Sequence, residues 1–258
     1  MKRVWLATMS MALACSGAKD QSNGGTSEAS KEASGTPSGQ VAAAPTGGGG
    51  IDGTVKFTGA APANQKIDMT EEPTCKEKYS TQPVNAVVAV KDGNLQNVFI
   101  YVKAGLPAGQ NWPAPSSPVV VDQEGCLYKP RVIGAMVNQG IQIKNSDAVL
   151  HNIKAVPKKN RGFNISQPQK GMETTKTFTT EEVPVPIECN VHGWMHGDVM
   201  VMTHPFFAVS GEDGKFSIKG LPAGTYTLEA WHEKLGTKTA TVTVTDNGSA
   251  TTSFSFSS

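Results

Sequence analysis

The sequence lacks several features that point to common classes of protein. It has no excess charge of either sign, since 23 Lys and Arg stand against 22 Asp and Glu. This balance argues against nucleic acid or an anionic membrane surface as the main partner. Aromatic residues make up only 7% of the chain, and no long amphipathic helical pattern occurs. Glycine and proline are instead frequent, and Val and Thr recur in short runs, which favours an all-β protein with many turns.

The N-terminal residues 1–15 resemble a bacterial lipoprotein signal. A positively charged start precedes the apolar stretch Val4–Ala14, which is too short to span a bilayer. Cys15 follows this stretch, at the position where such signals have the cysteine that becomes the lipidated first residue of the mature protein. The resemblance implies export to the periplasm or cell envelope, with a lipid anchor on Cys15 holding the protein at a bacterial membrane. The alternative is an ordinary cleaved secretion signal.

Residues 16–50 are rich in Ser, Gly, Ala, Thr and Pro, and no aromatic residue occurs between Trp5 and Phe57. Such a segment buries too little apolar surface to offset the entropy of ordering it. We therefore predict a disordered tether over 16–50 and a folded part that begins near Ile51.

The folded part contains short strand-like stretches separated by turn signals, which predicts a sandwich or barrel. One turn, Lys91–Asn94, has the chemistry of a tight hairpin. The expected strands are Ile51–Thr58, Asn85–Val90, Asn97–Lys103, Val119–Asp122, Arg131–Val137, Gln139–Asn145, His151–Val156, Thr174–Thr179, Val183–Cys189, Asp198–Thr203, Phe206–Ser210, Lys215–Lys219, Thr225–Trp231, Lys238–Val244 and Thr251–Phe256.

The residues with the most specific chemistry lie close together near position 190. Cys189, His192 and Met195 supply a thiolate, an imidazole and a thioether within seven residues, and His151 opens an expected strand upstream. One Cys with two His and a weak axial Met is the ligand set of blue copper centres. The pattern predicts one type 1 copper ion.

The spacing Cys-x2-His-x2-Met resembles the ligand loop of the plastocyanin and amicyanin group of cupredoxins. Upstream, the strand before Asn145, the Asn-x-Asp turn and the pair His151-Asn152 are also similar to that family. The resemblance covers about residues 118–203 and implies a Greek-key β-sandwich. The Val-Pro-Val-Pro run at 183–186 departs from the family, and its prolines predict an edge strand or a bulge before Cys189.

The resemblance also implies a role for each site residue. Cys189 is expected to dominate the electronic coupling, and His151 to be the buried histidine ligand. His192 is expected to lie nearer solvent and pass the electron through its ring edge. Met195 is expected to be the weak axial ligand, and Asn152 to tie the His151 loop to the cysteine loop.

Three other histidines and one tryptophan have less specific roles. Trp194, with Gly193, is expected either to form an apolar rim around His192 or simply to be buried. His196 is not expected to bind the copper, because neighbouring residues on a strand point to opposite faces. His196, His204 and His232 could form a second, surface metal site, although hydrogen bonding to the backbone is the simpler interpretation.

The cysteine count predicts a disulfide. If Cys15 is lipidated and Cys189 binds copper, the remaining two of the four cysteines are Cys75 and Cys126. In an exported protein these two are expected to pair. The alternative is two separate thiols, which an oxidising compartment disfavours.

The segment 204–258 resembles the carboxypeptidase regulatory-like, or transthyretin-like, β-sandwich. It contains a Gly-x-Phe strand, a Leu-Pro-x-Gly turn and a Tyr-x-Leu strand over Gly211–Leu228. Stretches within 51–117 are similar to the opening strands of that family. The copper domain at 118–203 is therefore either inserted in a small sandwich or preceded by a long extension.

Together these features predict a protein that is not an enzyme and that exchanges single electrons with an unidentified redox protein, for example a cytochrome or a dehydrogenase. A copper carrier or resistance protein is the second hypothesis. Such proteins usually have Met- or His-rich tracts, whereas the 9 methionines here are scattered. A non-catalytic surface module is the third, and it requires the Cys-His-Met loop to be coincidental.

Overall fold

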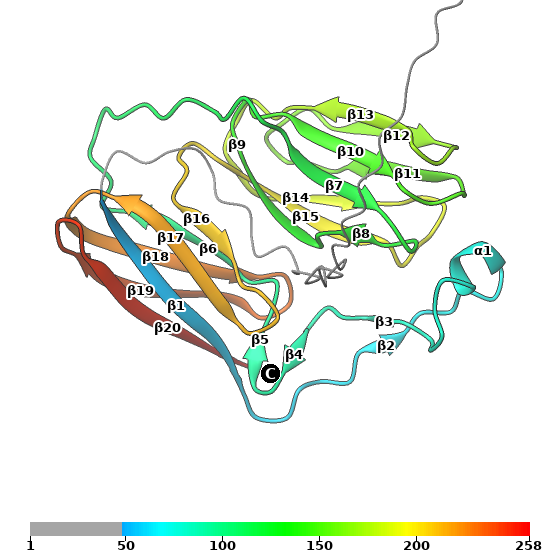
Figure 1. Ribbon diagram of the computed structural model, residues 1–258, viewed down its shortest axis with the longest axis horizontal. Helices are drawn as coiled ribbons and strands as arrows, with labels where there is room; N and C mark the ends of the chain where they lie inside the picture. The colour runs from blue at the N-terminus through cyan, green and yellow to red at the C-terminus, as the bar shows by residue number, and fades with distance from the viewer. Residues whose placement is uncertain (1–47) are drawn as a thin grey trace, which may run out of the picture. The chain divides into compact units, whose positions relative to one another are not determined.

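Figure 1 shows the computed structural model, which describes residues 48–258. The predicted signal at 1–15, with Cys15, and residues 16–47 of the predicted tether lie outside the described residues. The described part is built almost wholly of strands, and its one helix is the short α1 (Pro73–Lys76), which confirms the all-β prediction. No helix in residues 48–258 is long and apolar enough to cross a membrane.

Strands from both ends of the described chain form one two-sheet unit, here called the flanking sandwich. Its first sheet has the order β17-β1-β5-β4, with β20 pairing in parallel with β1, and its second has the order β16-β6-β18-β19. The bounds are β1 (Gly49–Thr58), β4 (Val90–Lys91), β5 (Asn94–Leu95), β6 (Phe99–Ala104), β16 (Phe207–Val209), β17 (Lys215–Leu221), β18 (Gly224–His232), β19 (Gly236–Val244) and β20 (Ser249–Ser257).

The strands between residues 119 and 202 form a second two-sheet unit, here called the inner sandwich. Its sheets have the orders β13-β10-β7-β8 and β12-β11-β14-β15-β9. The bounds are β7 (Val119–Gln123), β8 (Tyr128–Lys129), β9 (Val132–Met136), β10 (Ile141–Asn145), β11 (His151–Ala155), β12 (Phe163–Gln167), β13 (Glu173–Lys176), β14 (Glu182–Glu188) and β15 (His196–Met202). Within residues 48–258 these strands pair only with one another, so the topology is that of an insertion into the flanking sandwich.

Each sandwich has its own apolar core, because alternate residues of its strands point inward. In β10, Ile141, Ile143 and Asn145 are buried while the residues between them are half-exposed. A third apolar cluster joins the two sandwiches, and it includes Phe99 and Phe207 of the flanking sandwich with Met136 and Met200 of the inner one. The two sandwiches are therefore packed together through side chains of both.

The predicted boundary of the tether at residue 50 is wrong by two residues. Gly49 and Gly50 already belong to β1 and are buried. A Cβ atom on Gly49 would lie 2.4 Å from Val244 Cγ1 and 2.9 Å from the Leu221 carbonyl oxygen. The run of glycines therefore continues into the sheet because side chains do not fit there.

One expected strand differs from the structure, and observed strands also occur where none was expected. The segment Asn85–Val90 is not one strand: β3 (Val84–Asn85) pairs with β2 (Gln65–Lys66), and β4 begins only at Val90. The hairpin expected at Lys91–Asn94 joins β4 to β5, with positive φ at both of its central residues. Strand β12 was not expected, although Phe163 and Ile165 alternate with the polar Asn164 and Ser166 along it.

The two prolines of the strand before Cys189 lie in the interior of a sheet. Strand β14 stands between β11 and β15, so the edge position is wrong. The register with β15 shifts between Glu182 and Val185, which is the irregularity that the bulge alternative predicts. A bulge lets Pro184 lack a donor without breaking the rest of the ladder.

Candidate metal centre

Cys189, His192 and Met195 lie on the tight loop that connects β14 to β15. Glu188 and His196 are paired on these antiparallel strands, so the loop must close over the residues between them. The Cys189 N–H donates to the Met195 carbonyl at 3.1 Å, and the Met195 N–H donates to the His192 carbonyl at 2.9 Å. The backbone of the loop is therefore fixed by its own hydrogen bonds.

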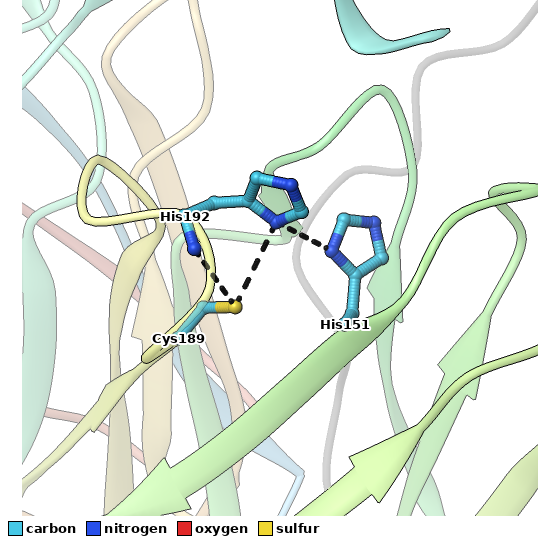
Figure 2. Close-up of side chains that lie close together, drawn as sticks. All are labelled: His151, Cys189 and His192. Atoms are coloured by element: carbon cyan, nitrogen blue, oxygen red, sulfur yellow. Dashed lines mark hydrogen bonds between the residues drawn. The ribbon is translucent and has the colours of Figure 1, made fainter. Parts of the chain in front are cut away.

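His151 comes from the neighbouring strand β11, which pairs with β14. Its Nδ1 atom lies 3.0 Å from His192 Nδ1, and His192 Nδ1 lies 3.8 Å from Cys189 Sγ. Figure 2 shows the two rings turned toward one another beside the cysteine sulfur. The three side chains offer ligand atoms that all lie within 4.8 Å of one another. Two imidazole nitrogens and a thiolate that point at one small volume fit a copper ion.

The surroundings of the Cys189 thiol favour its ionised form. Burial raises its pKa, but hydrogen bonds from His151, His192 and two backbone groups outweigh this and lower the pKa to about 5. One of these donors is the His192 N–H, which lies 3.4 Å from Sγ. The thiolate is the form that binds a metal, so the site favours the required state of its softest ligand.

Met195 is completely buried and packs in the same apolar cluster as Cys189. Its backbone holds the loop closed, as described above. The role of its thioether as axial ligand stays a prediction.

Asn152 connects the two parts of the site. Its Oδ1 accepts a hydrogen bond from the Asn190 N–H at 2.7 Å and lies 3.4 Å from Cys189 Sγ. Its amide nitrogen donates to Asn164 Oδ1 at 2.7 Å. The side chain thus spans from the strand that carries His151 to the loop that carries Cys189, as the sequence led us to expect.

Asp147 is a site residue that sequence reasoning missed. It is completely buried, and its Oδ2 lies 2.9 Å from His151 Nε2. The same carboxylate accepts hydrogen bonds from the backbone of Gly125 and Cys126 and forms an ion pair with Lys78. The Asn-x-Asp turn could have indicated this role, because it places Asp147 four residues before His151 and within reach of its ring.

His192 was expected to lie nearer solvent than His151, and in the structure the two rings differ little in exposure. Only 2% of the His192 surface is exposed, against 0% for His151. Its Nε2 atom lies 3.6 Å from Glu72 Oε2 and 3.9 Å from Cys75 Sγ. Another segment, residues 67–83 with α1 at its centre, contacts the edge of the His192 ring and buries it. We call this segment the cap.

The cap is held against the inner sandwich by several bonds. Cys75 and Cys126 form a disulfide, with their Cα atoms 5.7 Å apart. Lys78 Nζ lies 2.7 Å from Asp147 Oδ1, and the Tyr79 hydroxyl donates to the Gly125 carbonyl at 2.6 Å. The disulfide and the Tyr79 bond reach residues 125–126, which precede β8, whereas Lys78 reaches Asp147 in the loop between β10 and β11. The cap is therefore anchored on two loops, one of which carries the partner of His151.

Trp194 completes the wall around His192. Their ring centres are 5.1 Å apart, and the indole Nε1–H donates to the Cys126 carbonyl at 2.9 Å. The half-buried indole therefore borders His192 and also holds the loop of the disulfide. Gly193 is exposed, and a Cβ placed on it would meet no atom within 4 Å.

The remaining histidines lie apart from the site. His196 is exposed and its Nε2 lies 2.8 Å from the Gly193 carbonyl. His204 and His232 are buried, and each accepts a hydrogen bond from a nearby backbone N–H. In residues 48–258, the groups of three potential metal ligands include none of these three histidines.

Comparison with known proteins gives partial matches. The family model of polysaccharide lyase family 4, domain II, matches residues 203–253, so the family found for this segment differs from the transthyretin-like one that was expected. No curated protein matches the chain.

Among solved structures, the chain is similar to a purple cupredoxin from Nitrosopumilus maritimus, with 22% identity, a TM-score of 0.28, and 32% of this chain and 97% of that one covered. It is also similar to an amicyanin variant in its Cu(I) form, with 20% identity, a TM-score of 0.30, and coverage of 41% and 98%. A copper-containing nitrite reductase from Thermus scotoductus SA-01 matches with 20% identity and a TM-score of 0.29, over 38% of this chain and 25% of that one.

Proposed function

We propose that this protein is a type 1 copper protein that carries single electrons between redox partners and does not turn over a substrate. We place the copper domain at 118–203, with His151, Cys189 and His192 as the principal ligands and Met195 as the axial one. The observation that carries the proposal is the convergence of two imidazole Nδ1 atoms and a thiolate sulfur in a buried site.

The residues around the site would support electron transfer by keeping the positions of the ligands fixed. Strands β11, β14 and β15 fix the ligands, and Asn152 joins the two ligand-bearing segments. The apolar cluster that includes Cys189 and Met195 excludes water from the site. A bound copper ion would supply exchange between Cu(I) and Cu(II), and a rigid, dry ligand set keeps the reorganisation small during that exchange.

The burial of the ligands also favours an electron carrier over a copper carrier. A protein that hands its copper to another needs ligands that a partner or chelator can reach. Here Cys189 is 4% exposed and His192 is 2% exposed under the cap. An electron, unlike an ion, can cross a covered ligand without opening the site.

The decisive experiment is a titration of the metal-free chain with copper, followed by absorption spectroscopy. We expect an intense thiolate-to-copper charge-transfer band that is lost in Cys189→Ser and kept in His196→Ala, since His196 is exposed outside the donor cluster. Failure to bind copper, or binding without the band, would overturn the proposal. Rapid loss of bound copper to a chelator would favour the carrier function instead.

We also propose, from the sequence, that the chain is exported and tethered to a membrane by a lipid on Cys15, so that the copper site meets its redox partner at the cell envelope. The test is detergent phase partition of the protein expressed with its natural N-terminus. The unaltered chain is expected in the detergent phase, and Cys15→Ala in the aqueous phase or unprocessed. Equal behaviour of the two proteins would remove the lipid anchor from the proposal.

A further inference from the structure

We infer that Asp147 is a positioning residue of the copper site: its carboxylate fixes the tautomer of His151 and favours the oxidised state of the metal, and Glu72 acts in the same sense, more weakly, on His192. This inference rests on the proposed copper function. It concerns the outer nitrogens of the two histidines, which face away from the donor cluster.

The surroundings of Asp147 hold its carboxylate in the charged form. Oδ2 accepts from the Cys126 N–H at 2.7 Å, and Oδ1 accepts from the Gly125 N–H at 2.9 Å. Lys78 Nζ lies 2.7 Å from Oδ1. Two backbone N–H donors and an ammonium group thus surround the buried carboxylate, and all three favour its charged form.

A charged carboxylate determines where the proton of His151 resides. It can only accept hydrogen bonds, so the His151 Nε2 atom, at 2.9 Å, must carry a hydrogen. In the neutral ring the lone pair is then on Nδ1, the atom that faces His192 and Cys189. The ring cannot turn over without losing this bond, so Asp147 presents the correct nitrogen to a metal.

The same contact changes the electron density of the ligand. A carboxylate that accepts from the outer nitrogen of a metal-bound imidazole raises the basicity of the inner one, and its negative charge favours the more highly charged metal. Both effects stabilise Cu(II) relative to Cu(I). The carboxylate is completely buried, so water does not screen it.

Glu72 interacts with His192 in a similar way, through the charge of its carboxylate, but more weakly. Its Oε2 lies 3.6 Å from His192 Nε2, which is too long for a hydrogen bond, and its side chain is 31% exposed. We therefore expect its charge to act at a distance and to be partly screened. The two histidines thus have unequal carboxylate partners, one from the inner sandwich and one from the cap.

The test measures the midpoint potential and the charge-transfer band of the copper-loaded full chain. Mutation of the residue that accepts a hydrogen bond from a metal-bound histidine typically costs about 10- to 100-fold in metal affinity. For Asp147→Asn we expect a loss of this size for Cu(II) and a smaller one for Cu(I). Each tenfold difference between the two oxidation states raises the potential by about 59 mV.

Lys78→Met provides the test of opposite sign. It removes the cation that partly neutralises Asp147 and leaves the contact with His151 in place, so the potential should fall. Glu72→Gln should raise the potential by less than Asp147→Asn does. Glu77→Gln, a change of the same kind at an exposed position in the same segment, is the matched control and should leave the potential unchanged.

These variants separate the possible failures. If the unaltered chain shows no charge-transfer band, the proposed function fails. If the band is present but Asp147→Asn leaves the potential unchanged or lowers it, the inference is wrong. If Asp147→Asn does not fold, an unchanged or raised potential in Lys78→Met overturns the inference for Asp147. An unchanged or lowered potential in Glu72→Gln overturns the part that concerns Glu72.

Discussion

The Sγ atom of Cys75 lies 3.9 Å from Nε2 of His192, so one half of the Cys75–Cys126 disulfide rests against the edge of a proposed copper ligand. The disulfide therefore does more than join two distant parts of the sequence. It keeps the cap, and with it Glu72, over the face of the ring that would otherwise meet solvent. Removal of the bond should affect both the stability of the fold and the retention of the metal.

We expect the double variant Cys75→Ser with Cys126→Ser to release copper faster to a chelator than the unaltered chain. The two residues are 51 positions apart in the sequence. Closing a loop of that length stabilises a protein by about 4 kcal/mol in the chain-entropy model. Denaturant unfolding of the metal-free protein should show a loss of about 2–4 kcal/mol.

Both cysteines are changed together so that no new free thiol competes for copper. The single substitution Lys78→Met removes another contact that anchors the cap and keeps the disulfide. Its rate of copper release is compared with that of the double cysteine variant. Equal copper release from the double variant and the unaltered chain would show that the cap does not control access to the site.

Met195→Leu tests the assignment of the axial ligand. Met195 is completely buried, and Leu has a similar volume, so the loss of stability should be less than about 1.5 kcal/mol. If the thioether is a weak axial ligand, the charge-transfer spectrum should change and the potential should rise, because Cu(II) loses more than Cu(I) when a donor is removed. An unchanged spectrum and potential would assign Met195 to core packing alone.

That the proposed ligands come together was predictable from the sequence because their chemistry and spacing are local. Cys189, His192 and Met195 share one loop, and a loop between two paired strands must bring them together. His151 could be added because it opens an expected strand upstream and belongs to the His-Asn pair that resembles the cupredoxins. The link that Asn152 makes to the cysteine loop came from the resemblance of the His151-Asn152 pair to the cupredoxins.

The cap was not predictable, because its position depends on partners far away in the chain. Residues 67–83 have no periodic apolar pattern, and α1 is only one turn long. Glu72 lies against His192 because the disulfide between Cys75 and Cys126 holds the cap there. A predicted Cys75–Cys126 bond does not by itself indicate that the cap would contact His192. The parallel pairing of β1 with β20 was also not predictable, because it joins strands at the two ends of the described chain.

Gly134→Ala should weaken the contact between the two sandwiches. A Cβ at this position of β9 would lie 2.3 Å from Phe207 Cε2 and 3.0 Å from Phe99 Cε2. Overpacking of this kind typically costs about 1–3 kcal/mol, so thermal unfolding should occur several degrees lower. The cost should be smaller in a Phe207→Leu background, which makes room for the methyl group; an equal cost in both backgrounds would contradict this account.

Asp198 should make the stability of the protein depend on pH. It is 8% exposed in β15 and near Glu233 and Arg131. Burial, with the charge of Glu233, raises the pKa of its carboxyl to about 7, while Arg131 opposes the shift. Arg131 is only a partial counterion because its guanidinium is already engaged by both carboxylate oxygens of Glu233, at 2.6 and 2.9 Å.

A carboxyl whose pKa is higher in the folded state binds more protons there than in the unfolded chain. The contribution of Asp198 to the free energy of unfolding is therefore fully present below pH 3.8, the pKa of the carboxyl in the unfolded chain. It is lost as the pH rises through about 7, the pKa in the folded state. Asp198→Asn, which resembles the protonated form, should stabilise the protein at pH 8 and change it little at pH 4. Thermal unfolding of both proteins between these limits measures the difference. A difference that stays constant with pH would show that Asp198 does not titrate in this range, because other groups contribute equally to the two proteins.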